Sequence, residues 1–302
     1  MEPIASGRAV NSAGEGNVEL AYEVYGDAGD PPIVLVNGLG NQMIHYDTGF
    51  VAALVERGLR PIRFDNRDTG RSTWIDAKVD FNGAFSAWRA GEAVEGAPYD
   101  LSDLAADTVA VLDAVGVERA HVFGMSMGGM IAQQVAIDHP DRVLSLISVM
   151  STTGEPEYGK ASKEAFGVLT AAPPRTAEEA GDAALAAAKV IGSPAHLDEA
   201  WLRARAVEAF ERASNPKGIA RQLVAIYATG SRAAGLAGLK VPTCVIHGAL
   251  DPLVGPDGGR RTAELVPDAE LHMIDGMGHD LPPGLWGTIG DLVAAHVARS
   301  SA

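Results

Sequence analysis

The sequence predicts an α/β protein in which a mostly parallel sheet is covered by helices on both faces. Three observations carry this prediction. Short apolar segments alternate with segments of helical periodicity over 1–150, and the same alternation returns over 239–302. Strands that are apolar along their whole length are typical of parallel sheets buried on both sides. Between these parts, over 151–238, the alternation stops and helix-forming residues predominate.

The elements expected within 1–150 follow from the spacing of apolar residues. Val18, Leu20, Tyr22 and Val24 stand at every second position, which is typical of a half-exposed strand. Continuous apolar stretches indicate buried strands, and apolar residues three or four positions apart indicate helices. In chain order the patterns predict a strand over 18–26, a strand over 32–37, a helix over 50–58, a strand over 59–65, a helix over 101–115, a strand at 121–123 with a helix after it, and a strand over 143–149.

The segment 151–238 is rich in alanine, charged residues and helix formers, and it shows no convincing buried strand. We therefore expect a helical cap inserted into one sheet, with 1–150 and 239–302 as the two parts of the core. The core is expected to resume with a strand over 243–247, a helix near 258–265, a strand over 270–274 and a helix near 285–298.

An unusual concentration of aromatic residues lies between Ser72 and Leu101, in a protein with only 6% aromatics: Trp74, Phe81, Phe85, Trp88 and Tyr99. A long excursion of this kind is often a lid or a wall of a functional site. The alternative is a loop whose aromatic side chains only pin it to the core. The sequence favours neither interpretation over the other.

The composition excludes several classes of function. The formal net charge of −15 opposes binding to nucleic acids and anionic membranes, because these partners require a basic surface. Cys244 is the only cysteine, so an internal disulfide is impossible, and its apolar neighbours predict a buried strand position. No dinucleotide fingerprint, lysine-based cofactor site or metal-ligand cluster is recognisable, and we expect no cofactor and no metal.

The expected location follows from two further features. The first twenty residues contain no apolar core of signal-peptide length. No apolar run reaches the roughly 18 residues that a membrane helix needs. The sequence therefore favours a cytoplasmic protein that acts on a small molecule.

Ser126 stands between Gly124 and Gly128, after a short apolar strand and before a helical pattern. Serine often caps helices, but a cap does not require glycines on both sides. Such glycines allow a strand to reverse into a helix within a few residues, which leaves the serine strained and its hydroxyl exposed above the sheet. Ser126 is therefore predicted to be a nucleophile.

A serine hydroxyl needs an adjacent base, and His279 is the best placed of the eight histidines. It follows the last expected strand in a loop of small residues. This position puts it at the carboxyl edge of the sheet, where Ser126 is also expected. His279 is therefore predicted to be the general base.

A carboxylate is needed to orient the base and to stabilise its charged form. Asp251 follows the strand over 243–247 and is predicted to take this role. Asp280 adjoins the histidine, but sequence neighbours seldom face each other correctly. Glu155 and Glu157 follow the strand over 143–149 and are weaker alternatives.

Two backbone N–H groups are predicted to hold the negative oxygen of a tetrahedral intermediate. Met127 begins the helix after the serine, where the helix dipole favours negative charge. Leu39, in the turn after the strand over 32–37, is the second expected donor; the alternative is an ordinary tight turn. The substrate pocket is expected between the cap and the sheet edge, with core filling as the alternative for its methionines, and its candidate residues are Met43, His45, Met125, Met130 and Met277.

Five motifs together resemble the α/β-hydrolase superfamily, and the resemblance covers nearly the whole chain. In the order of that family they are NGLG (37–40), FDNRDTGRS (64–72), GMSMGG (124–129), HGALDPLV (247–254) and GMGHD (276–280). The chain is most similar to a bacterial branch of small carboxylic ester hydrolases that includes aclacinomycin methylesterase. The resemblance implies an α/β-hydrolase fold with an inserted helical cap over 151–238.

The resemblance also implies roles for individual residues. Ser126, Asp251 and His279 would form a catalytic triad, with Leu39 and Met127 as oxyanion donors. The family's pattern further implies structural ion-pair and hydrogen-bond roles for three residues of the second motif, which are Asp65, Arg67 and Arg71. Many relatives carry His-Gly where this chain has Asn37-Gly38, but a backbone donor needs no imidazole.

The predicted function is hydrolysis of a carboxylic ester through an acyl-enzyme, with a small to medium apolar substrate. A serine at residue 126 argues against epoxide opening and halide displacement, because relatives with those activities carry aspartate there. Two alternatives stay open. One is a ligand-binding receptor of the same fold with little turnover, and the other is a lactonase, thioesterase or acyl transferase with the same triad.

Overall fold

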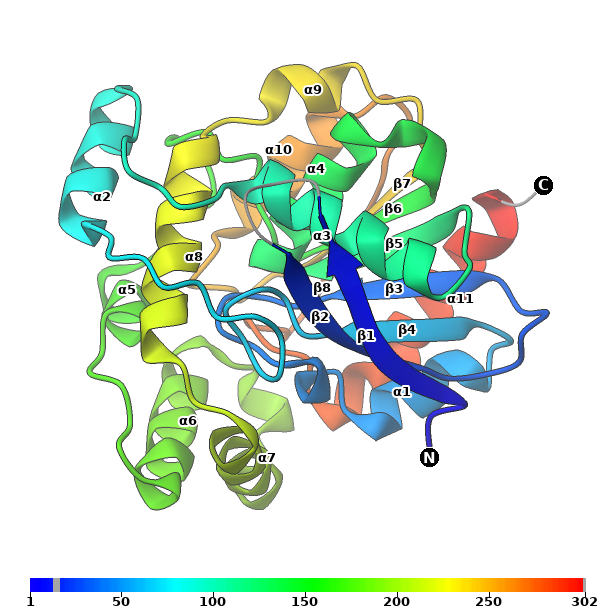
Figure 1. The fold of residues 1–302 in the computed structure, drawn as a ribbon, viewed down its shortest axis with the longest axis horizontal. Coiled ribbons are helices and arrows are strands. Elements are labelled where there is room, and N and C mark those ends of the chain that lie inside the picture. The colour runs from blue at the N-terminus through cyan, green and yellow to red at the C-terminus, as the bar shows by residue number, and fades with distance from the viewer. Residues whose placement is uncertain (13–16, 301–302) are drawn as a thin grey trace.

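The computed structural model describes residues 1–12 and 17–300, and these residues form one eight-stranded sheet flanked by helices (Figure 1). The strand order is β1-β2-β4-β3-β5-β6-β7-β8. Only β1–β2 and β2–β4 pair antiparallel, so the predicted mostly parallel sheet is confirmed. The strands are β1 (Ala5–Asn11), β2 (Val18–Val24), β3 (Pro32–Val36), β4 (Arg60–Phe64), β5 (Ala120–Met125), β6 (Val143–Val149), β7 (Thr243–Gly248) and β8 (Glu270–Ile274).

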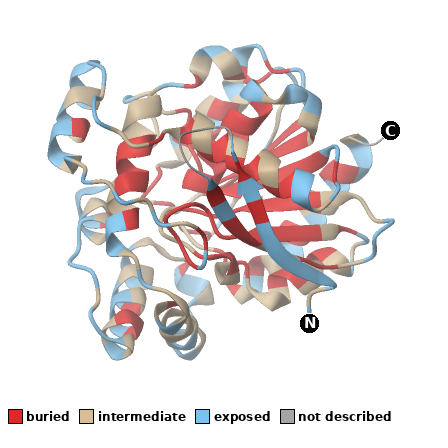
Figure 2. Ribbon diagram, in the orientation of Figure 1, coloured by how far each residue is buried: buried red, intermediate tan, exposed pale blue. Residues whose placement is uncertain are grey.

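Helices fall into those that cover the sheet and those that stand beside it. Helices α5, α6 and α7 lie to one side of the sheet, and Figure 2 shows that they carry mostly intermediate and exposed residues. The helices are α1 (Thr48–Val55), α2 (Phe81–Ala90), α3 (Leu101–Ala114), α4 (Met127–Asp138), α5 (Lys163–Leu169), α6 (Ala177–Ile191), α7 (Glu199–Arg212), α8 (Pro216–Thr229), α9 (Ala233–Ala237), α10 (Pro256–Leu265) and α11 (Trp286–Ser300).

The central strand β3 shows why the sheet is covered on both faces. Val34 and Val36 belong to a core cluster with residues of α3 and α4, whereas Ile33 and Leu35 belong to a second cluster with residues of α1 and α11. Neighbouring side chains of a strand point to opposite faces of the sheet, so a strand that is apolar along its whole length must be covered on both faces. The apolar run that predicted this strand therefore also explains its central position.

Two elements were not predicted. Strand β1 lies at the sheet edge, and only Ala9 and Asn11 of its seven residues are buried, so it lacks an apolar run. Helix α2 lies inside the aromatic-rich stretch. The Asp80 side chain accepts a hydrogen bond from the Gly83 N–H at its start, and Gly91 ends it in the left-handed region with φ of 72°. Both are ordinary helix-end signals.

Residues 151–238 form α5 to α9 and contain no strand, all of them being among the described residues. These helices do not form a separate compact unit. Helix α8 packs against α2, which lies outside the segment, and α9 packs against α4 and α10 of the core. The layer beside the sheet edge is therefore built from two distant parts of the chain (Figure 1).

The turn after β4 is held by buried charges. Arg67 pairs with Asp107 of α3, with Nε and Oδ2 2.6 Å apart. Asp65 accepts hydrogen bonds from the N–H groups of Met43 and Arg71 and pairs with Arg212 of α7. Arg71 contributes its backbone N–H, and its side chain is exposed. No described helix is long and apolar enough to cross a membrane.

His121 of β5 is a buried titratable group in the middle of the sheet. Its Nδ1 lies 2.7 Å from Ser145 Oγ, and its Nε2 has no hydrogen-bond partner among the described residues. Burial, together with the nearby His296 and Arg119, lowers the pKa of His121 from 6.5 to about 4. Charging this imidazole is therefore unfavourable in the folded protein.

The pKa of His121 predicts an acid-dependent loss of stability. His121 is protonated at a higher pH in the unfolded chain than in the folded protein. The free energy of unfolding should therefore fall as the pH drops from 6.5 to about 4. This one group changes the free energy of unfolding by at most about 1.4 kcal/mol per pH unit. The free energies of unfolding of the wild type and of His121→Gln can be measured by urea unfolding at several pH values across that range. The variant should lack this part of the pH dependence, and equal pH dependences for the two proteins would contradict the prediction.

Candidate active site

The backbone of Ser126 is strained. It lies between β5 and α4 with φ of 58° and ψ of −121°, in a region that residues with side chains rarely adopt. Its N–H donates to the Val149 carbonyl at 2.9 Å, and its own carbonyl accepts from the Ser151 hydroxyl at 2.9 Å. These bonds hold the turn, and the side chain remains partly exposed.

The glycines beside Ser126 are required by close packing. A Cβ added at Gly128 would lie 2.0 Å from the Val36 carbonyl oxygen, and one added at Gly124 would lie 2.0 Å from the Gly128 carbonyl oxygen. From the sequence, these glycines are predicted to supply the conformational freedom of the reversal. The structure places the positive φ at the serine, where strain is predicted, and the glycines let α4 begin directly against the sheet.

Three side chains that are far apart in sequence converge at the carboxyl edge of the sheet. His279 Nε2 lies 2.9 Å from Ser126 Oγ, and His279 Nδ1 lies 2.7 Å from Asp251 Oδ2. The loops after β7 and β8 are tied together, because the Leu250 N–H donates to the Met277 carbonyl at 2.9 Å. This arrangement can take a proton from the hydroxyl and hold the resulting positive charge.

Asp251 is held as an ionised carboxylate. Its side chain is fully buried, and Oδ1 accepts hydrogen bonds from the N–H groups of Leu253 and Val254, each at 2.9 Å. Burial alone would raise the pKa of Asp251. The charge of His279, hydrogen bonds from His247 and His279, and the Val254 N–H together lower it to about 2. The carboxylate therefore stays charged at neutral pH.

The alternative acids are engaged elsewhere. Asp280 accepts hydrogen bonds from Ser193, at 2.5 Å from the hydroxyl and 3.1 Å from the backbone N–H. Ser193 Oγ also accepts from the Gly278 N–H at 2.9 Å, so this contact supports the loop that carries His279. Glu155 pairs with Arg261 at 2.9 Å, and Glu157 lines a cavity described below.

The two expected oxyanion donors lie on segments that flank the serine. Met127 is the first residue of α4, and a Cβ added at Gly38, next to Leu39, would lie 3.3 Å from Ser126 Cβ. Within the described part of the chain, neither N–H is bonded to a protein acceptor. Neither group is thus committed to a protein partner in that part of the chain, as an oxyanion donor requires.

The loop after β3 is supported without an imidazole. Asn37 Nδ2 donates to the Phe64 carbonyl at 3.2 Å, and the Asn37 carbonyl accepts from Asn66 Nδ2 at 3.0 Å. Asn66 belongs to the turn after β4. The side chain that replaces the family's usual histidine thus ties the loop after β3 to the end of β4, and the backbone carbonyl of the same residue ties it to the turn after β4.

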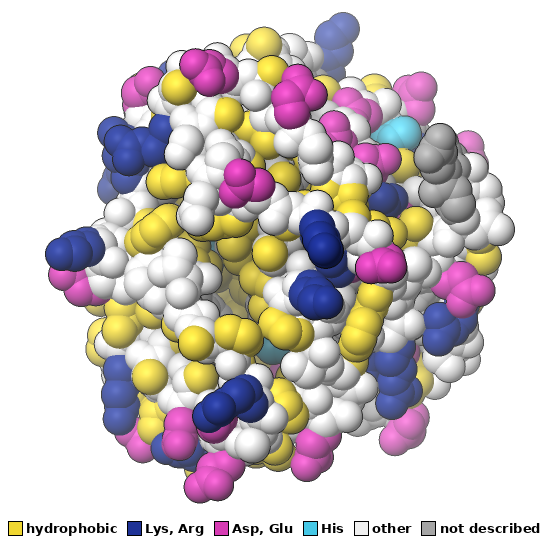
Figure 3. Space-filling model, turned by 60° about the vertical axis from the view of Figure 1, so that its left-hand side comes forward, with side chains coloured by type: hydrophobic (Ala, Val, Ile, Leu, Met, Phe, Trp, Pro, Cys, Tyr) yellow, Lys and Arg dark blue, Asp and Glu magenta, His cyan; other side chains and the backbone are white. Residues whose placement is uncertain are grey.

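A cavity of about 760 Å³ has an aromatic wall. It reaches Met130, one turn after Ser126, and also Leu253 and Val254, whose N–H groups bind Asp251. Figure 3 shows a hollow lined by hydrophobic side chains on the face where α2, α5 and α8 lie. The aromatic residues lining the cavity are Phe85, Trp88, Tyr158, Phe166 and Tyr227.

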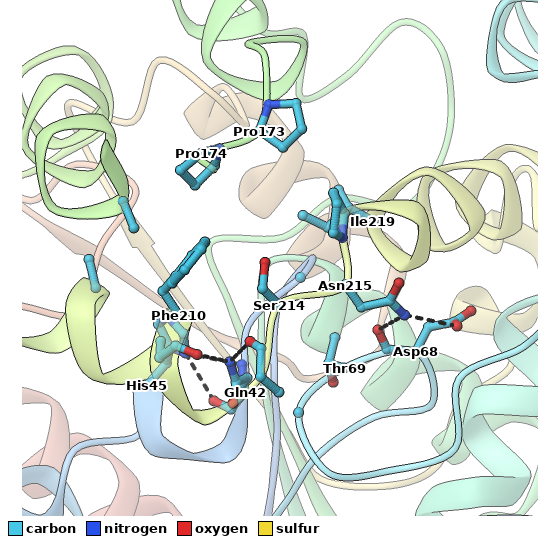
Figure 4. Close-up of a pocket in the computed structure, with 17 residues that line it drawn as sticks. Gln42, His45, Asp68, Thr69, Pro173, Pro174, Phe210, Ser214, Asn215 and Ile219 are labelled. Carbon is cyan, nitrogen blue, oxygen red and sulfur yellow. Dashed lines mark hydrogen bonds between the residues drawn. The ribbon is translucent and has the colours of Figure 1, made fainter. Parts of the chain in front are cut away.

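The predicted pocket residues lie in different places. Met130 lines the large cavity, whereas Met43, Met125 and Met277 are buried and do not line it. His45 borders a separate cavity of about 200 Å³ between α7, the start of α8 and the turn after β4 (Figure 4). Its Nδ1 accepts from the Gln42 N–H at 3.0 Å, and burial lowers its pKa.

Of the residues that line the large cavity, the sequence predicts Met130 and none of the aromatic side chains as pocket residues, although one signal points to them. Phe85 and Trp88 belong to the aromatic-rich stretch, and the ring centroids of Trp88 and of Tyr227 in α8 are 5.1 Å apart. The sequence does not distinguish a lid or wall from a pinned loop, because the helix that packs on this stretch lies more than a hundred residues further along the chain. That packing could not be read from local spacing.

Comparison with known proteins gives consistent results. Residues 31–282 match the alpha/beta hydrolase fold family. The chain is 29% identical to rhodomycin D methylesterase DnrP of Streptomyces peucetius and 30% identical to DauP of Streptomyces sp. strain C5, covering 94% of this chain and 96% of each relative. The fold is similar to that of the meta-cleavage product hydrolase CumD of Pseudomonas fluorescens IP01, with a TM-score of 0.74, 18% identity and 98% of both chains covered.

Gly128→Ala is expected to displace the turn at Ser126. The added Cβ would lie 2.0 Å from the Val36 oxygen, so the start of α4 must move away from the sheet. We expect the free energy of unfolding to fall by about 1–3 kcal/mol. The rate at which a fluorophosphonate labels Ser126 should fall about 10²-fold, which is the effect expected when a reacting group is displaced by about 1 Å. Gly167→Ala is the control, because its Cβ would meet nothing within 4 Å. Equal labelling rates would refute the packing argument.

Proposed function

The chain belongs to the alpha/beta hydrolase fold family, and from this premise we propose that it hydrolyses a carboxylic ester through an acyl-enzyme formed on Ser126. It is a carboxylic ester hydrolase, and the two relatives reported above, which it matches over nearly the whole chain, are named methylesterases. One observation carries the mechanism: His279 lies within hydrogen-bond distance of both Ser126, at 2.9 Å, and Asp251, at 2.7 Å.

Acylation begins with proton transfer from the Ser126 hydroxyl to His279 Nε2. The Oγ–carbon bond forms as the carbonyl π electrons move to oxygen, and the N–H groups of Leu39 and Met127 hold this oxyanion. Asp251 fixes the Nδ1–H tautomer and stabilises the imidazolium. When the intermediate collapses, the bond to the leaving oxygen breaks, and that oxygen takes the proton from Nε2.

Deacylation repeats the same steps with water as the nucleophile. His279 takes a proton from water as its oxygen bonds to the acyl carbon, and Oγ then leaves with the proton from Nε2. The products are a carboxylic acid and an alcohol, and the chain's own residues account for every proton. Because Asp251 is charged at neutral pH, it can accept a hydrogen bond from His279 Nδ1 at every step of the cycle.

The substrate proposed is a methyl ester of a bulky apolar acid. The relatives are named methylesterases, and the cavity of about 760 Å³ with its aromatic wall offers space for an acid larger than the short acyl chains of simple test esters. This extends the expectation of a small to medium apolar substrate. A cytoplasmic location and the absence of a nucleic-acid partner stay predictions from the sequence.

Ser126→Ala tests the acyl-enzyme. We expect multiple turnover of short-chain p-nitrophenyl esters by the wild type, and a loss of kcat on the order of 10⁶ in the variant. Release of p-nitrophenol and near-ultraviolet circular dichroism measure activity and folding. A single burst without turnover would favour a receptor, and full activity in the variant would refute a serine nucleophile.

Asp251→Asn and Asp280→Asn decide which carboxylate orients His279. The first change should lower kcat on the order of 10⁴, because asparagine supports the wrong imidazole tautomer. The second should lower it by less than about tenfold, because Asp280 is bonded to Ser193 and an amide oxygen still accepts from its N–H. Equal losses in the two variants would contradict the assignment.

A further inference from the structure

The loop after β3 is oriented by a side chain from α8. Within the loop, the Asn41 N–H closes a turn on the Gly38 carbonyl at 3.1 Å. Gly40, next to Leu39, has φ of 68°, and its N–H leaves the loop to donate to Gln222 Oε1 at 2.9 Å. The peptide that follows Leu39 is therefore fixed by a residue 182 positions away.

The amide of Gln222 is fixed at both ends. Its Nε2 donates to the Arg67 carbonyl at 2.9 Å, and the side chain is fully buried. An amide oxygen only accepts and an amide nitrogen only donates, so the two partners allow one orientation. Gln222 thus connects the loop after β3 with the turn after β4.

Helix α8 is seated firmly beside this amide. Arg221 forms a buried pair with Asp68, with Nε 2.8 Å from Oδ2 and Nη2 2.7 Å from Oδ1. Ile219 packs on the loop so closely that a Cβ added at Gly40 would lie 2.9 Å from its Cγ1 (Figure 4). The position of the Gly40 N–H acceptor is therefore set by the position of α8.

We infer that Gln222 is a positioning residue for ester cleavage, which aims the Leu39 N–H at the oxyanion by holding the Gly40 N–H. The inference rests on the proposed function, because Leu39 has this task only when an oxyanion forms at Ser126. Preorganised donors stabilise a transition state only in the correct geometry, so a loosened loop loses catalysis before it loses substrate binding. The oxyanion site is thus complete only when α8 is seated.

Gln222→Met removes both hydrogen bonds of the side-chain amide and keeps a similar side-chain volume. We expect kcat for a p-nitrophenyl ester to fall about 10–10²-fold with KM changed less than about threefold, because the bond to the oxyanion forms only in the transition state. The affinity of a trifluoromethyl ketone, which forms an oxyanion on Ser126, should fall by the same factor. The control is Gln134→Met, since that glutamine donates to Asp138 within α4.

An unchanged kcat in the folded Gln222→Met protein would overturn the inference. A kcat loss without a matching loss of ketone affinity would also overturn it, because the defect would then lie outside the oxyanion site. Turnover by the wild type and its loss in Ser126→Ala test the proposed function alone, so the two failures are distinguishable.

If Gln222→Met does not fold, Gln222→Glu provides the same test. A protonated glutamic acid can accept from the Gly40 N–H and donate to the Arg67 carbonyl, whereas the carboxylate repels that carbonyl. Relative to the wild type, ketone affinity in this variant should fall as the pH rises. A ratio that does not change with pH would overturn the inference.

Discussion

The structure depends on the close contact between the Val36 carbonyl and Gly128, which leaves no room for a side chain between β3 and α4. This contact brings the helix to the sheet within one turn of the strand end, and it leaves Ser126 with a left-handed backbone. The same strand continues into the loop that carries Leu39. One packing constraint therefore sets both the nucleophile and the segment that faces it.

Buried charges fix the helices beside the sheet edge. The turn after β4 supplies Asp65 and Asp68, which pair with Arg212 of α7 and Arg221 of α8. Removing either partner would leave an uncompensated buried charge, which is far more costly than loss of an exposed pair. These helices therefore cannot lift from the core without separating buried ions, and the layer behaves as part of the scaffold.

The sequence predicted what depends on local pattern. Ser126, Asp251 and His279 each follow an apolar strand, and parallel strands end at the same sheet edge, so their convergence could be expected before the structure. It could not predict contacts made by distant helices. The bond from Gly40 to Gln222 and the aromatic wall depend on how α2 and α8 pack, and the burial of Met277 depends on its cluster with residues of α1 and α11; no local spacing encodes either.

The aromatic wall joins two segments that are separate in the chain, because Phe85 and Trp88 precede α3 whereas Tyr227 lies in α8. Residues 72–101 and 151–238 therefore determine the shape of the aromatic wall together. A chimera that exchanges only the helical insertion with a relative would join mismatched halves. To transfer the substrate preference of one such enzyme to another, both segments should be exchanged together.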